Sequence, residues 1–573
     1  MQKINSSIKL QQRPCNPQLL TADCSLHPVL QRVFSARDIQ SFAEVEYALK
    51  ALTPPHLITH LQQAAEILMG HLQQQSNILV FGDYDADGAT STALCVRALI
   101  LMGHENINFL LPDRFKDGYG VSENVAKRII NLKPDLVITV DTGISSFKGL
   151  SLLKQENIEV IVTDHHLPAD ELPDVSVIVN PNAFNESAGK NLAGVGVAFY
   201  LMLELRRLLR KVSWFDDRPE PNLAECLDLV AIGTVADLVI LDYNNRILVN
   251  EGLKRLRAGA CSAGIRKLIE VSGKMRQSLS SQDIGFSIAP RLNAAGRLDD
   301  MTIGVQTLLI DDETVATQLA YDLEDMNKNR REIQSQMQDQ ALAMLPDVEH
   351  DQNRYSFVLY QQDWHEGVVG IIASKIKDVT YRPVISFASA GDGLLKGSGR
   401  SVTGVHLRDM LDLVDKSEPD LIIRFGGHAM AAGLTIKEQD LSRFTECFEK
   451  ILQQHVDPVH FNNTLLSDGE INGQEMTLEL AKILRDAGPW GQRFPAPSFD
   501  GQFKVLDKRI LSNKHLKFVL TAKDSHSPID AILFFATDQQ LKTNYQDLHI
   551  FYELSVNDFR GEQNPQLMIR HIF

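Results

Sequence analysis

The chain has 573 residues, with 57 lysines and arginines against 73 aspartates and glutamates, and a formal net charge of −16. This length exceeds what one hydrophobic core usually serves and predicts about three or four domains. The hydrophobic share of 44% and the charged share of 23% are typical of globular proteins, and no run of about 18 apolar residues indicates a membrane span. A protein embedded in a bilayer is therefore excluded.

The N-terminus has no apolar segment followed by a small-residue cleavage site, so we expect a cytoplasmic protein. The six cysteines are scattered without a C-x-x-C pair, which argues against structural zinc and against a disulfide framework. The excess of acid would ordinarily argue against nucleic acid as a partner. A nucleic-acid-binding chain of this composition must concentrate its basic groups in local tracks on an acidic body.

An α/β domain is predicted over residues 46–312, after a polar extension over residues 1–45 that we expect to pack on the main body. Apolar, β-branched runs alternate there with amphipathic stretches such as residues 90–102 and 122–131. Continuous apolar runs indicate strands buried on both faces, and hence a doubly wound parallel sheet covered by helices. The predicted strands are residues 77–83, 107–111, 135–141, 159–164 and 177–180.

Three further parts follow this domain. A charged stretch within residues 313–346 predicts a long connecting helix, and strand-like runs beside a Gly-rich ribbon predict a second α/β domain over residues 347–455. Short alternating runs over residues 456–573 predict an antiparallel β-barrel, of the five-stranded OB-like kind that binds oligonucleotides. The predicted fold class is thus α/β and multidomain, with a C-terminal barrel.

Three of the predicted parallel strands end in aspartate, at Asp83, Asp141 and Asp164. Ligands of open parallel sheets bind beyond the carboxyl ends of the strands, so these side chains should converge. The first loop adds Asp85 and Asp87 just before a helix, and the loop after Asp164 continues with two histidines. The sequence therefore predicts a cluster of carboxylates and imidazoles at one sheet edge.

Such a cluster is electrostatically costly unless cations neutralise it. Oxygen-rich sites suit Mg²⁺ or Mn²⁺, and imidazole shifts the preference toward Mn²⁺ or another transition metal. With five or more candidate ligands, two metals bridged by a carboxylate fit better than one. That arrangement suits hydrolysis at phosphorus, where the ions activate water and stabilise charge on the phosphate.

Taken singly, each motif has a simpler interpretation. A D-x-D sequence at a strand end is most often a helix N-cap or a solvated turn, and a histidine pair in a loop has no fixed meaning. Their joint occurrence at one sheet edge favours a metal site. A dinucleotide site is disfavoured because the first loop lacks G-x-G-x-x-G and is negatively charged. An aspartyl-phosphate receiver domain would also cluster acids, but it needs no histidine pair.

The segments VFGDYDADGATSTAL, VDTGISS, TDHH and GTVADLV resemble, in order and spacing, the four motifs of the DHH phosphoesterase superfamily. The segments RLNAAGR, WHEGVVGIIASKI, KGSGRS and FGGHAMAAG resemble those of its long members, the bacterial single-strand-specific exonucleases. The resemblance covers nearly the whole chain. It implies a DHH catalytic domain, a DHH-associated substrate-binding domain and an OB-like nucleic-acid-binding barrel.

The resemblance also implies a two-metal centre that holds Mn²⁺ or Mg²⁺. The implied ligands are Asp85, Asp87, Asp141, His165, His166 and Asp237. Asp164 is expected to orient the neighbouring imidazoles, with direct ligation left open. Asp83 is either a supporting partner or an occasional ligand. Some relatives carry a histidine four residues before Asp85, where this chain has Phe81; this puts one ligand of the short-chain relatives in doubt, but not the two-metal core.

An exonuclease must also hold a strand end. Arg114 follows a predicted strand and should lie over the same sheet edge, although it could instead pair with Asp113 or Asp117. Ser398 and Arg400 lie on the Gly-rich ribbon, whose amides can cradle a phosphate. The resemblance implies that these three residues contact the 5′ phosphate and help set the polarity of degradation.

Further DNA contacts are expected from Arg291, Asn293 and Arg297, since arginine suits bidentate contact with phosphate. His428 lies in a tight glycine turn, and both a turn-stabilising role and a contact near the scissile phosphate are open. We interpret Trp364 and His365 as packing residues.

Basic and aromatic residues of the barrel could form a stacking groove for single strands, with a solvated face as the alternative. These residues are Lys504, Lys508, Arg509, Lys514, Lys517 and Phe518. From residue 460 onward the chain holds 12 lysines and arginines against 14 aspartates and glutamates, so the barrel region is nearly neutral.

The predicted function is that of a metal-dependent 5′→3′ exonuclease that degrades single-stranded DNA to 5′-mononucleotides in DNA repair and recombination, through a cleft too narrow for duplex. One alternative is a small-substrate DHH phosphoesterase acting on oligoribonucleotides, 3′-phosphoadenosine phosphate (pAp), pyrophosphate or a cyclic dinucleotide, although such enzymes commonly lack the barrel. Another is a non-catalytic DHH-fold replication scaffold, against which the intact acids and histidines argue. We expect a monomer without membrane association; the resemblance suggests single-strand-binding protein and a helicase as partners.

Overall fold

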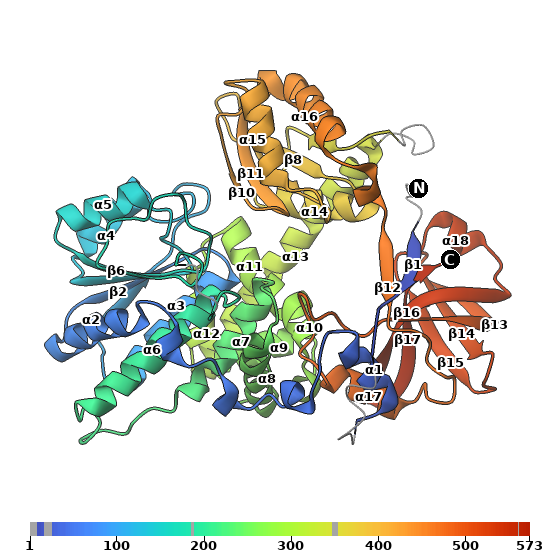
Figure 1. Cartoon of the computed structure of the whole chain (residues 1–573), viewed down its shortest axis with the longest axis horizontal. Helices are drawn as coiled ribbons and strands as arrows, with labels where there is room; N and C mark the ends of the chain where they lie inside the picture. The colour runs from blue at the N-terminus through green and yellow to red at the C-terminus, as the bar shows by residue number, and fades with distance from the viewer. Residues whose placement is uncertain (1–7, 17–25, 185–187, 346–352, 560) are drawn as a thin grey trace.

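The computed structural model describes residues 8–16, 26–184, 188–345, 353–559 and 561–573 (Figure 1). Within them the chain forms a parallel sheet, a mixed sheet, a closed barrel and a two-stranded ribbon. The parallel-sheet domain and the barrel lie at opposite ends of the molecule, and the mixed-sheet domain projects from the middle. The predicted α/β multidomain fold with a C-terminal barrel is confirmed.

The first sheet has the strand order β3-β2-β4-β5-β6, and all neighbouring strands are parallel. Its strands are β2 (Ile78–Gly82), β3 (Ile107–Leu110), β4 (Leu136–Val140), β5 (Glu159–Thr163) and β6 (Val177–Val179). All residues of β2 and β4 are buried, as the continuous apolar runs predicted. Alternate side chains enter two hydrophobic clusters, with Val80 in one and Phe81 in the other.

Helices cover both faces of this sheet (Figure 1). On one face lie α2 (Leu61–Gln74), α3 (Ala86–Leu101) and α6 (Gly194–Lys211). On the other lie α4 (Glu123–Leu132) and α5 (Phe147–Gln155).

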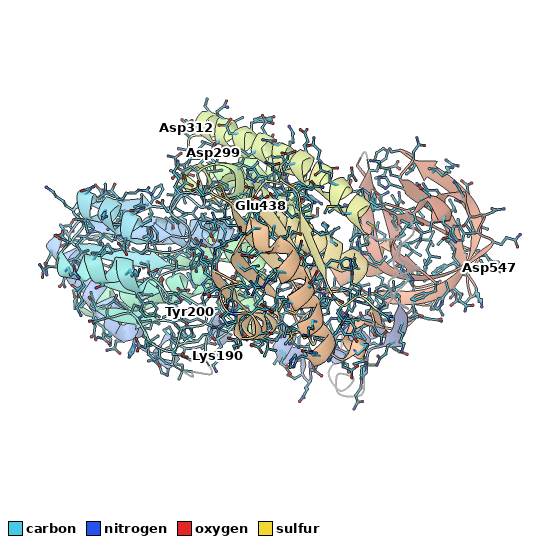
Figure 2. All side chains as sticks on the ribbon, turned by 90° about the horizontal axis from the view of Figure 1, so that it is seen from above. Lys190, Tyr200, Asp299, Asp312, Glu438 and Asp547 are labelled. Carbon is cyan, nitrogen blue, oxygen red and sulfur yellow. The ribbon has the colours of Figure 1, made fainter. Side chains whose placement is uncertain are left out.

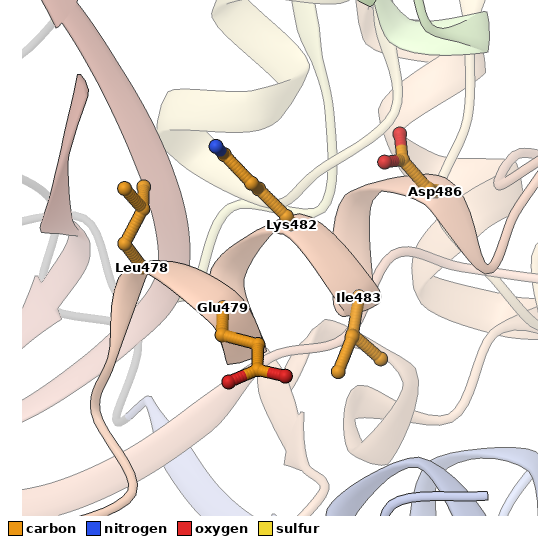
Figure 3. Close-up of a pocket in the computed structure, with 5 residues that line it drawn as sticks. All are labelled: Leu478, Glu479, Lys482, Ile483 and Asp486. Atoms are coloured by element: carbon orange, nitrogen blue, oxygen red, sulfur yellow. The ribbon is translucent and has the colours of Figure 1, made fainter. Parts of the chain in front are cut away.

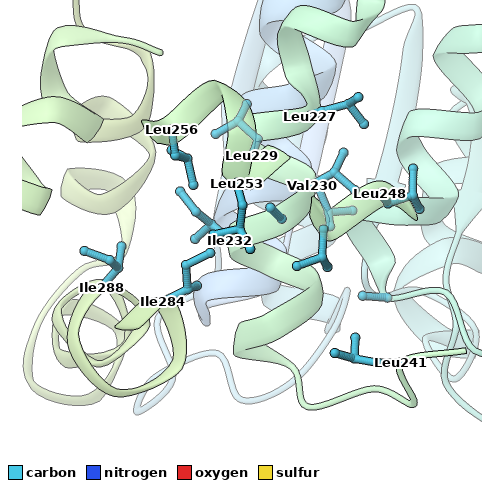
Figure 4. Close-up of a cluster of buried hydrophobic side chains, with 14 of the residues drawn as sticks. Leu227, Leu229, Val230, Ile232, Leu241, Leu248, Leu253, Leu256, Ile284 and Ile288 are labelled. Carbon is cyan, nitrogen blue, oxygen red and sulfur yellow. The ribbon is translucent and has the colours of Figure 1, made fainter. Parts of the chain in front are cut away.

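A helical layer follows the sheet, and α7 (Leu227–Ala236) runs through it. Figure 4 shows Leu229, Val230 and Ile232 among apolar side chains of the neighbouring helices. Because α7 is buried along nearly its whole length, the residue after it, Asp237, is held firmly. The other elements of the layer are α8 (Tyr243–Ala258), α9 (Ala263–Val271), α10 (Ser281–Asp283), the π-helical turn η7 (Ile284–Ile288), α11 (Ala289–Leu298) and α12 (Thr302–Leu309).

The predicted connecting helix is confirmed as α13 (Glu313–Met344), which spans 32 residues. It begins at Asp312, whose carboxylate accepts hydrogen bonds from the N–H groups of Thr314 and Val315. Figure 2 shows α13 running from Asp312 across the molecule toward the second domain.

The second domain contains the sheet β10-β11-β9-β8-β7, in which β7 and β8 are parallel and the other pairs antiparallel. Its strands are β7 (Phe357–Tyr360), β8 (Val384–Ser389), β9 (Leu394–Arg400), β10 (Arg424–Gly427) and β11 (Ala431–Lys437), and its helices are α14 (Val369–Thr380), α15 (Leu407–Ser417) and α16 (Leu441–His455). The Gly-rich ribbon of the sequence is β9, and the glycine turn around His428 joins β10 to β11.

The C-terminal barrel closes in the order β13-β14-β15-β17-β16. Its strands are β13 (Phe499–Leu511), β14 (His515–Ala522), β15 (Pro528–Leu533), β16 (Asp547–Phe559) and β17 (Glu562–Ile572), and the helices α17 (Leu478–Asp486) and α18 (Asp538–Lys542) accompany them. The predicted five-stranded barrel is confirmed, but the expectation that it is antiparallel throughout is wrong: β15 and β17, which are adjacent in the barrel and not consecutive in the chain, pair in parallel.

The predicted groove on the barrel needs correction. Phe518 is fully buried, because it lies at an inward position of the alternating strand β14; the expectation that it lines an exposed groove is wrong. Lys508 Nζ donates to the carbonyls of Leu541 and Thr543, and Lys517 pairs with Asp530. These two lysines are engaged within the barrel.

The N-terminal extension packs on the main body, as predicted, over its described residues. Its strand β1 (Lys9–Gln12) pairs in parallel with β12 (Thr464–Ser467), the segment that leads into the barrel. Its helix α1 (Pro28–Ser35) packs through Phe34 against Trp490 and Phe494, in the segment after α17. Residues 1–7 and 17–25 of the predicted extension lie outside the described residues.

A shallow groove runs along α17 and is lined by five of its residues (Figure 3). These are Leu478, Glu479, Lys482, Ile483 and Asp486. The groove lies on the barrel side of the molecule, remote from the ends of the parallel strands (Figure 1).

Among the described helices, none has the length and apolar character needed to cross a membrane.

Candidate active site

The carboxyl ends of β2, β4 and β5 bring the predicted carboxylates and histidines together. Asp85 caps α3: its Oδ1 accepts hydrogen bonds from the N–H groups of Asp87 and Gly88, at 2.9 and 3.0 Å. Gly88 lies against the Asp83 backbone, where a Cβ would come within 2.4 Å of a carbonyl oxygen. This close approach folds the first loop tightly and holds its three carboxylates at the sheet edge.

His165 lies at the centre of the cluster. Its Nε2 is 3.1 Å from Asp141 Oδ1 and 3.5 Å from Asp237 Oδ2. Asp141 follows β4 and Asp237 follows α7, so two distant segments meet at one imidazole. Asp141 adopts a left-handed backbone conformation, with φ of 59°.

Asp164 orients His166. Its Oδ1 accepts hydrogen bonds from His166 Nδ1 at 2.8 Å and from the N–H groups of His165 and His166, and its Oδ2 accepts from Ile144 N at 3.0 Å. Both oxygens of Asp164 are thereby engaged within the protein. With Nδ1 facing Asp164, the free Nε2 of His166 is the nitrogen available to a metal. The Tyr119 hydroxyl lies 3.2 Å from the same Nδ1.

The amides at the start of α6 hold Asp87, a contact that sequence reasoning missed. Gly194 N and Val195 N donate to the two oxygens of Asp87, at 2.7 and 3.0 Å. A Cβ at Gly194 would lie 2.4 Å from the Asp141 Cβ, so this position requires glycine. The sequence signal was the pair of glycines in LAGVGVA, which opens a helix.

Three overlapping groups of ligand atoms result, each with its atoms within 4.8 Å of one another. They are Asp141 with His165 and His166, Asp87 with His165 and Asp237, and Asp83 with Asp85 and Asp141. Asp141 and His165 each belong to two groups. The seven candidate ligands named from the sequence are therefore brought together, and Asp164 supports them from behind.

The electrostatics of the cluster call for cations. Burial and the charge of Asp85 raise the pKa of Asp83 to about 8, and burial with neighbouring carboxylates raises the pKa values of Asp87 and Asp237 to about 7. The pKa of Asp141 is raised well above its usual value for the same reasons. Burial disfavours the charged form of His166, but the hydrogen bond to Asp164 outweighs it and raises the pKa to about 9.

The residues fit divalent metal ions. Among the described residues, Asp83 Oδ1, Asp141 Oδ1 and His165 Nε2 are buried and make no hydrogen bond, although the last two atoms lie 3.1 Å apart; such groups are costly unless something else satisfies them. The donor set of carboxylate oxygens with two imidazoles suits Mn²⁺ or Mg²⁺. Asp141 and His165, which two ligand groups share, suit adjacent ions. Phe81 is fully buried in the core.

A group of arginines lies beside the carboxylates. Burial together with the charges of Arg114, Arg330 and Arg400 lowers the pKa of Arg297 to about 9, so these cations lie close to one another. Arg114 lies with its guanidinium carbon 4.2 Å from the centre of the Tyr84 ring. Its acidic neighbours pair elsewhere, Asp113 with Lys116 and Asp117 with Arg128. The arrangement is suited to a phosphate group.

The second domain contributes Ser398 and Arg400 to this arginine group. Arg400 Nη1 donates to Ser398 Oγ at 3.2 Å, and both side chains lie against Gly370 in the first turn of α14. Arg297 Nη1 donates to Gly367 O at 3.0 Å, which joins α11 to the same region. The basic group is thus built from both domains. Sequence reasoning missed Arg330, because nothing distinguishes it within the charged helix α13.

The remaining predicted DNA-binding residues have other partners or positions. Arg291 is buried, with its Nε 2.6 Å from Glu324. Asn293 Oδ1 accepts a hydrogen bond from Ala86 N at 2.9 Å, and so supports the metal loop. The His428 side chain reaches the surface, but its partial desolvation by neighbouring groups, followed by the nearby charge of His166, lowers its pKa. His428 is therefore near enough to His166 and His165 to be affected by their charge.

The fold and the site define a metal-dependent phosphoesterase of the DHH kind. The family model "DHH family, N-terminal domain" matches residues 77–234, "DHHA1 domain" matches residues 353–454, and "RecJ OB domain" matches residues 467–571. A relative from Salmonella typhimurium, the single-stranded-DNA-specific exonuclease RecJ, is 46% identical over 554 residues, which cover 96% of each chain.

Two crystal structures of RecJ from Thermus thermophilus are similar to this chain. The complex with Mn²⁺ has a TM-score of 0.80 at 29% identity and covers 99% of this chain and 79% of that one. The complex with Mg²⁺ has a TM-score of 0.75 at 27% identity and covers 98% and 78%. The chain belongs to the RecJ family of single-stranded-DNA-specific exonucleases.

Proposed function

We propose that this chain degrades single-stranded DNA from the 5′ end and releases 5′-mononucleotides. The observation that carries this proposal is the pairing of two sites: a cluster of buried carboxylates and histidines, and beside it an arginine group built by both domains. A nuclease that removes terminal nucleotides needs an anion site at a fixed offset from its hydrolytic site, and this pairing supplies one.

The divalent ions supply activation of water and neutralisation of the charge that develops on the phosphate. The chain's own residues prepare the site for them. The amides of α6 fix the Asp87 carboxylate, and Asp164 holds His166 in the tautomer that presents Nε2. Burial excludes water from Asp83 and Asp141, which strengthens their interaction with cations.

The 5′ phosphate is proposed to bind Arg114, Ser398 and Arg400. Arg297 and Arg330 add positive charge behind it, and His428 faces the scissile bond from the opposite domain. Arg291 and Asn293 act through their neighbours, since Arg291 is paired with Glu324 and Asn293 holds the first turn of α3. We propose that one strand passes between the two domains and that duplex is excluded there.

The barrel is proposed to bind the strand beyond the active site. Phe534 and Phe535 are 45% and 77% exposed and flank the His515 ring at 5.1 and 5.0 Å between ring centres. Exposed aromatic faces of this kind stack on nucleobases. This patch replaces the buried Phe518 in the proposed groove.

The test is a polarity assay. Single- and double-stranded DNA labelled at either end is incubated with Mn²⁺, with Mg²⁺ and with chelator. We expect mononucleotides to be released from the 5′ end of single strands only, and only with metal. Release from the 3′ end, or equal rates on duplex, would contradict the proposal.

A small-substrate phosphoesterase is the second candidate, and turnover of dinucleotides faster than of long strands would favour it. The proposed domain limits are residues 46–312 for the catalytic domain, 347–455 for the DHH-associated domain and 456–573 for the barrel. We further propose that the protein is a monomer and that it acts in the cytoplasm in DNA repair and recombination. Its proposed partners are single-strand-binding protein and a helicase.

A further inference from the structure

A junction centred on Arg37 joins parts of the chain that are far apart in sequence. The Arg37 side chain is 1% exposed and donates to both carboxylate oxygens of Asp468, at 2.9 and 3.0 Å. Its remaining N–H groups donate to the carbonyls of Val33, Pro495 and Ala496. All five donors of the guanidinium are therefore used, which fixes its position and that of its partners.

Asp468 lies at the end of the linker between the second domain and the barrel. Its N–H donates to Ser498 O at 2.6 Å, and its carboxylate accepts from Ser498 N at 2.9 Å. The residue before it, Ser467, pairs with Gln12 in the parallel β1–β12 ribbon. The N-terminal extension thus holds the linker through the β1–β12 strand pair, through the buried Arg37–Asp468 ion pair and through Arg13, whose Nε lies 3.5 Å from Asp468 Oδ1.

The junction reaches the catalytic domain through Trp490. The Trp490 ring lies 5.1 Å from Phe494 and 5.9 Å from Phe34 of α1, measured between ring centres. Ser281 Oγ of α10 donates to Trp490 O at 2.7 Å and accepts from Trp490 N at 3.1 Å. The segment that contains Trp490 and Phe494 therefore packs between helix α1 and the catalytic domain.

The same segment touches the loop that follows a metal ligand. Leu241 N donates to Gln492 O at 3.0 Å, and Leu241 lies four residues after Asp237. Arg246, from the following helix α8, lies with its guanidinium carbon 4.3 Å from the centre of the Phe494 ring. A continuous set of contacts thus runs from the barrel linker to the catalytic domain near its metal site.

We infer that Arg37 and Asp468 are positioning residues for the exonuclease reaction. They hold the linker, the barrel and the Trp490 segment on the catalytic domain. The distance between the barrel and the metal centre is thereby fixed. When the end of a DNA strand occupies the active site, the rest of the strand can then bind the barrel without a rearrangement of the domains. Rigid linkage of two binding sites raises the effective concentration of the second one.

This inference rests on the proposed function, because the distance matters only if the barrel binds the strand. The junction should therefore affect long and short DNA substrates differently. A strand of about 6 nucleotides fills little more than one site, whereas a strand of about 40 reaches both, given that one OB fold covers about 4–16 nucleotides. Only the long strand gains from the junction.

The experiment compares the full chain with the variants Arg37→Met and Asp468→Asn, the second being the milder change because it keeps the shape of the side chain. The matched control is Arg570→Met, which removes an exposed arginine paired with Glu553 on the barrel. Steady-state kinetics on both strand lengths and small-angle scattering without DNA are measured for each protein.

We expect both junction variants to raise KM for the long strand about tenfold, with kcat and short-strand turnover unchanged. The radius of gyration should increase, and the Arg570→Met control should match the wild type. Equal losses on both lengths, or unchanged scattering with unchanged KM, would overturn the inference and leave the proposed function standing. A wild-type enzyme with the same KM for both lengths would refute the proposed role of the barrel, and the inference with it.

Discussion

Asp164 accepts a hydrogen bond from His166 Nδ1 at 2.8 Å and receives three backbone N–H groups on the same carboxylate. The carboxylate is thus saturated by the protein and acts on the site through the imidazole. Burial disfavours the charged form of Asp164, but the His166 contact outweighs it, and its pKa is lowered. Asp164 therefore stays ionised while its neighbours in the cluster hold protons.

The first prediction concerns this pair. Asp164→Asn should weaken Mn²⁺ binding by about 10- to 100-fold, because His166 loses the partner that fixes its tautomer. Isothermal titration with Mn²⁺ measures the change. Asp174→Asn is the control, since Asp174 is exposed and pairs with the surface Lys154. Equal Mn²⁺ affinity in Asp164→Asn and wild type would contradict the role given to Asp164.

The second prediction concerns the two shared ligands. Asp141→Asn or His165→Ala should lower the cleavage rate at least about a thousandfold, since each change removes a ligand from two of the three groups. Single-strand binding, followed by fluorescence anisotropy with Ca²⁺ in place of Mn²⁺, should change little. Full cleavage activity in either variant would refute the metal assignment.

The third prediction concerns pH. In the metal-free protein the pKa values of Asp83, Asp87 and Asp237 are about 8, 7 and 7, above the usual value near 3.8. Between about pH 4 and pH 8 the folded state therefore binds more protons than the unfolded state. The associated stability is complete below about pH 4 and is lost as the pH rises through 7 to 8.

Metal binding must displace these protons. Apparent Mn²⁺ affinity should therefore rise about tenfold per pH unit for each proton released, up to about pH 9, because His166, with a pKa of about 9, must also lose a proton to bind through Nε2. Unfolding midpoints with Mn²⁺ and with chelator, measured from pH 5.5 to 8.5, test this. The gap between the two midpoints should widen with pH, and a constant gap would count against the raised pKa values.

The fourth prediction concerns the strand end. Arg400→Ala should lower kcat/KM on 5′-phosphorylated strands by about 10- to 100-fold, the effect of one or two charge-assisted hydrogen bonds, and should affect 5′-hydroxyl strands much less. Arg443→Ala on α16, an exposed arginine paired with Glu418, is the control. The same loss on both kinds of end would argue against a 5′-phosphate site.

The fifth prediction compares two phenylalanines of the barrel. Phe535→Ala should weaken single-strand binding by about 1–3 kcal/mol without loss of stability, because the ring is 77% exposed and available for stacking. Phe518→Ala should cost about 3–5 kcal/mol of stability, because its buried ring is part of the core. Anisotropy and thermal unfolding separate the two effects, and weaker binding by Phe518→Ala alone would reverse the assignment.

The sequence alone determined the domain order, the parallel sheet and the cluster of acids and histidines. This was possible because strand burial leaves continuous apolar runs, and because carboxyl ends of parallel strands share one edge. The ligand Asp141 could be named for that reason, whereas Asp237, which follows the helix α7, was implied by resemblance alone.

Only the tertiary structure decided what each polar group contacts. In the folded chain Arg291 pairs with Glu324, Asn293 bonds to Ala86, and Arg37 pairs with Asp468. The Phe518 ring is buried in the barrel, whereas the Phe535 ring is exposed. Each outcome depends on contacts between segments distant in sequence or on the facing of a single strand. Residue type and local spacing do not encode these features, because they follow from how the domains pack.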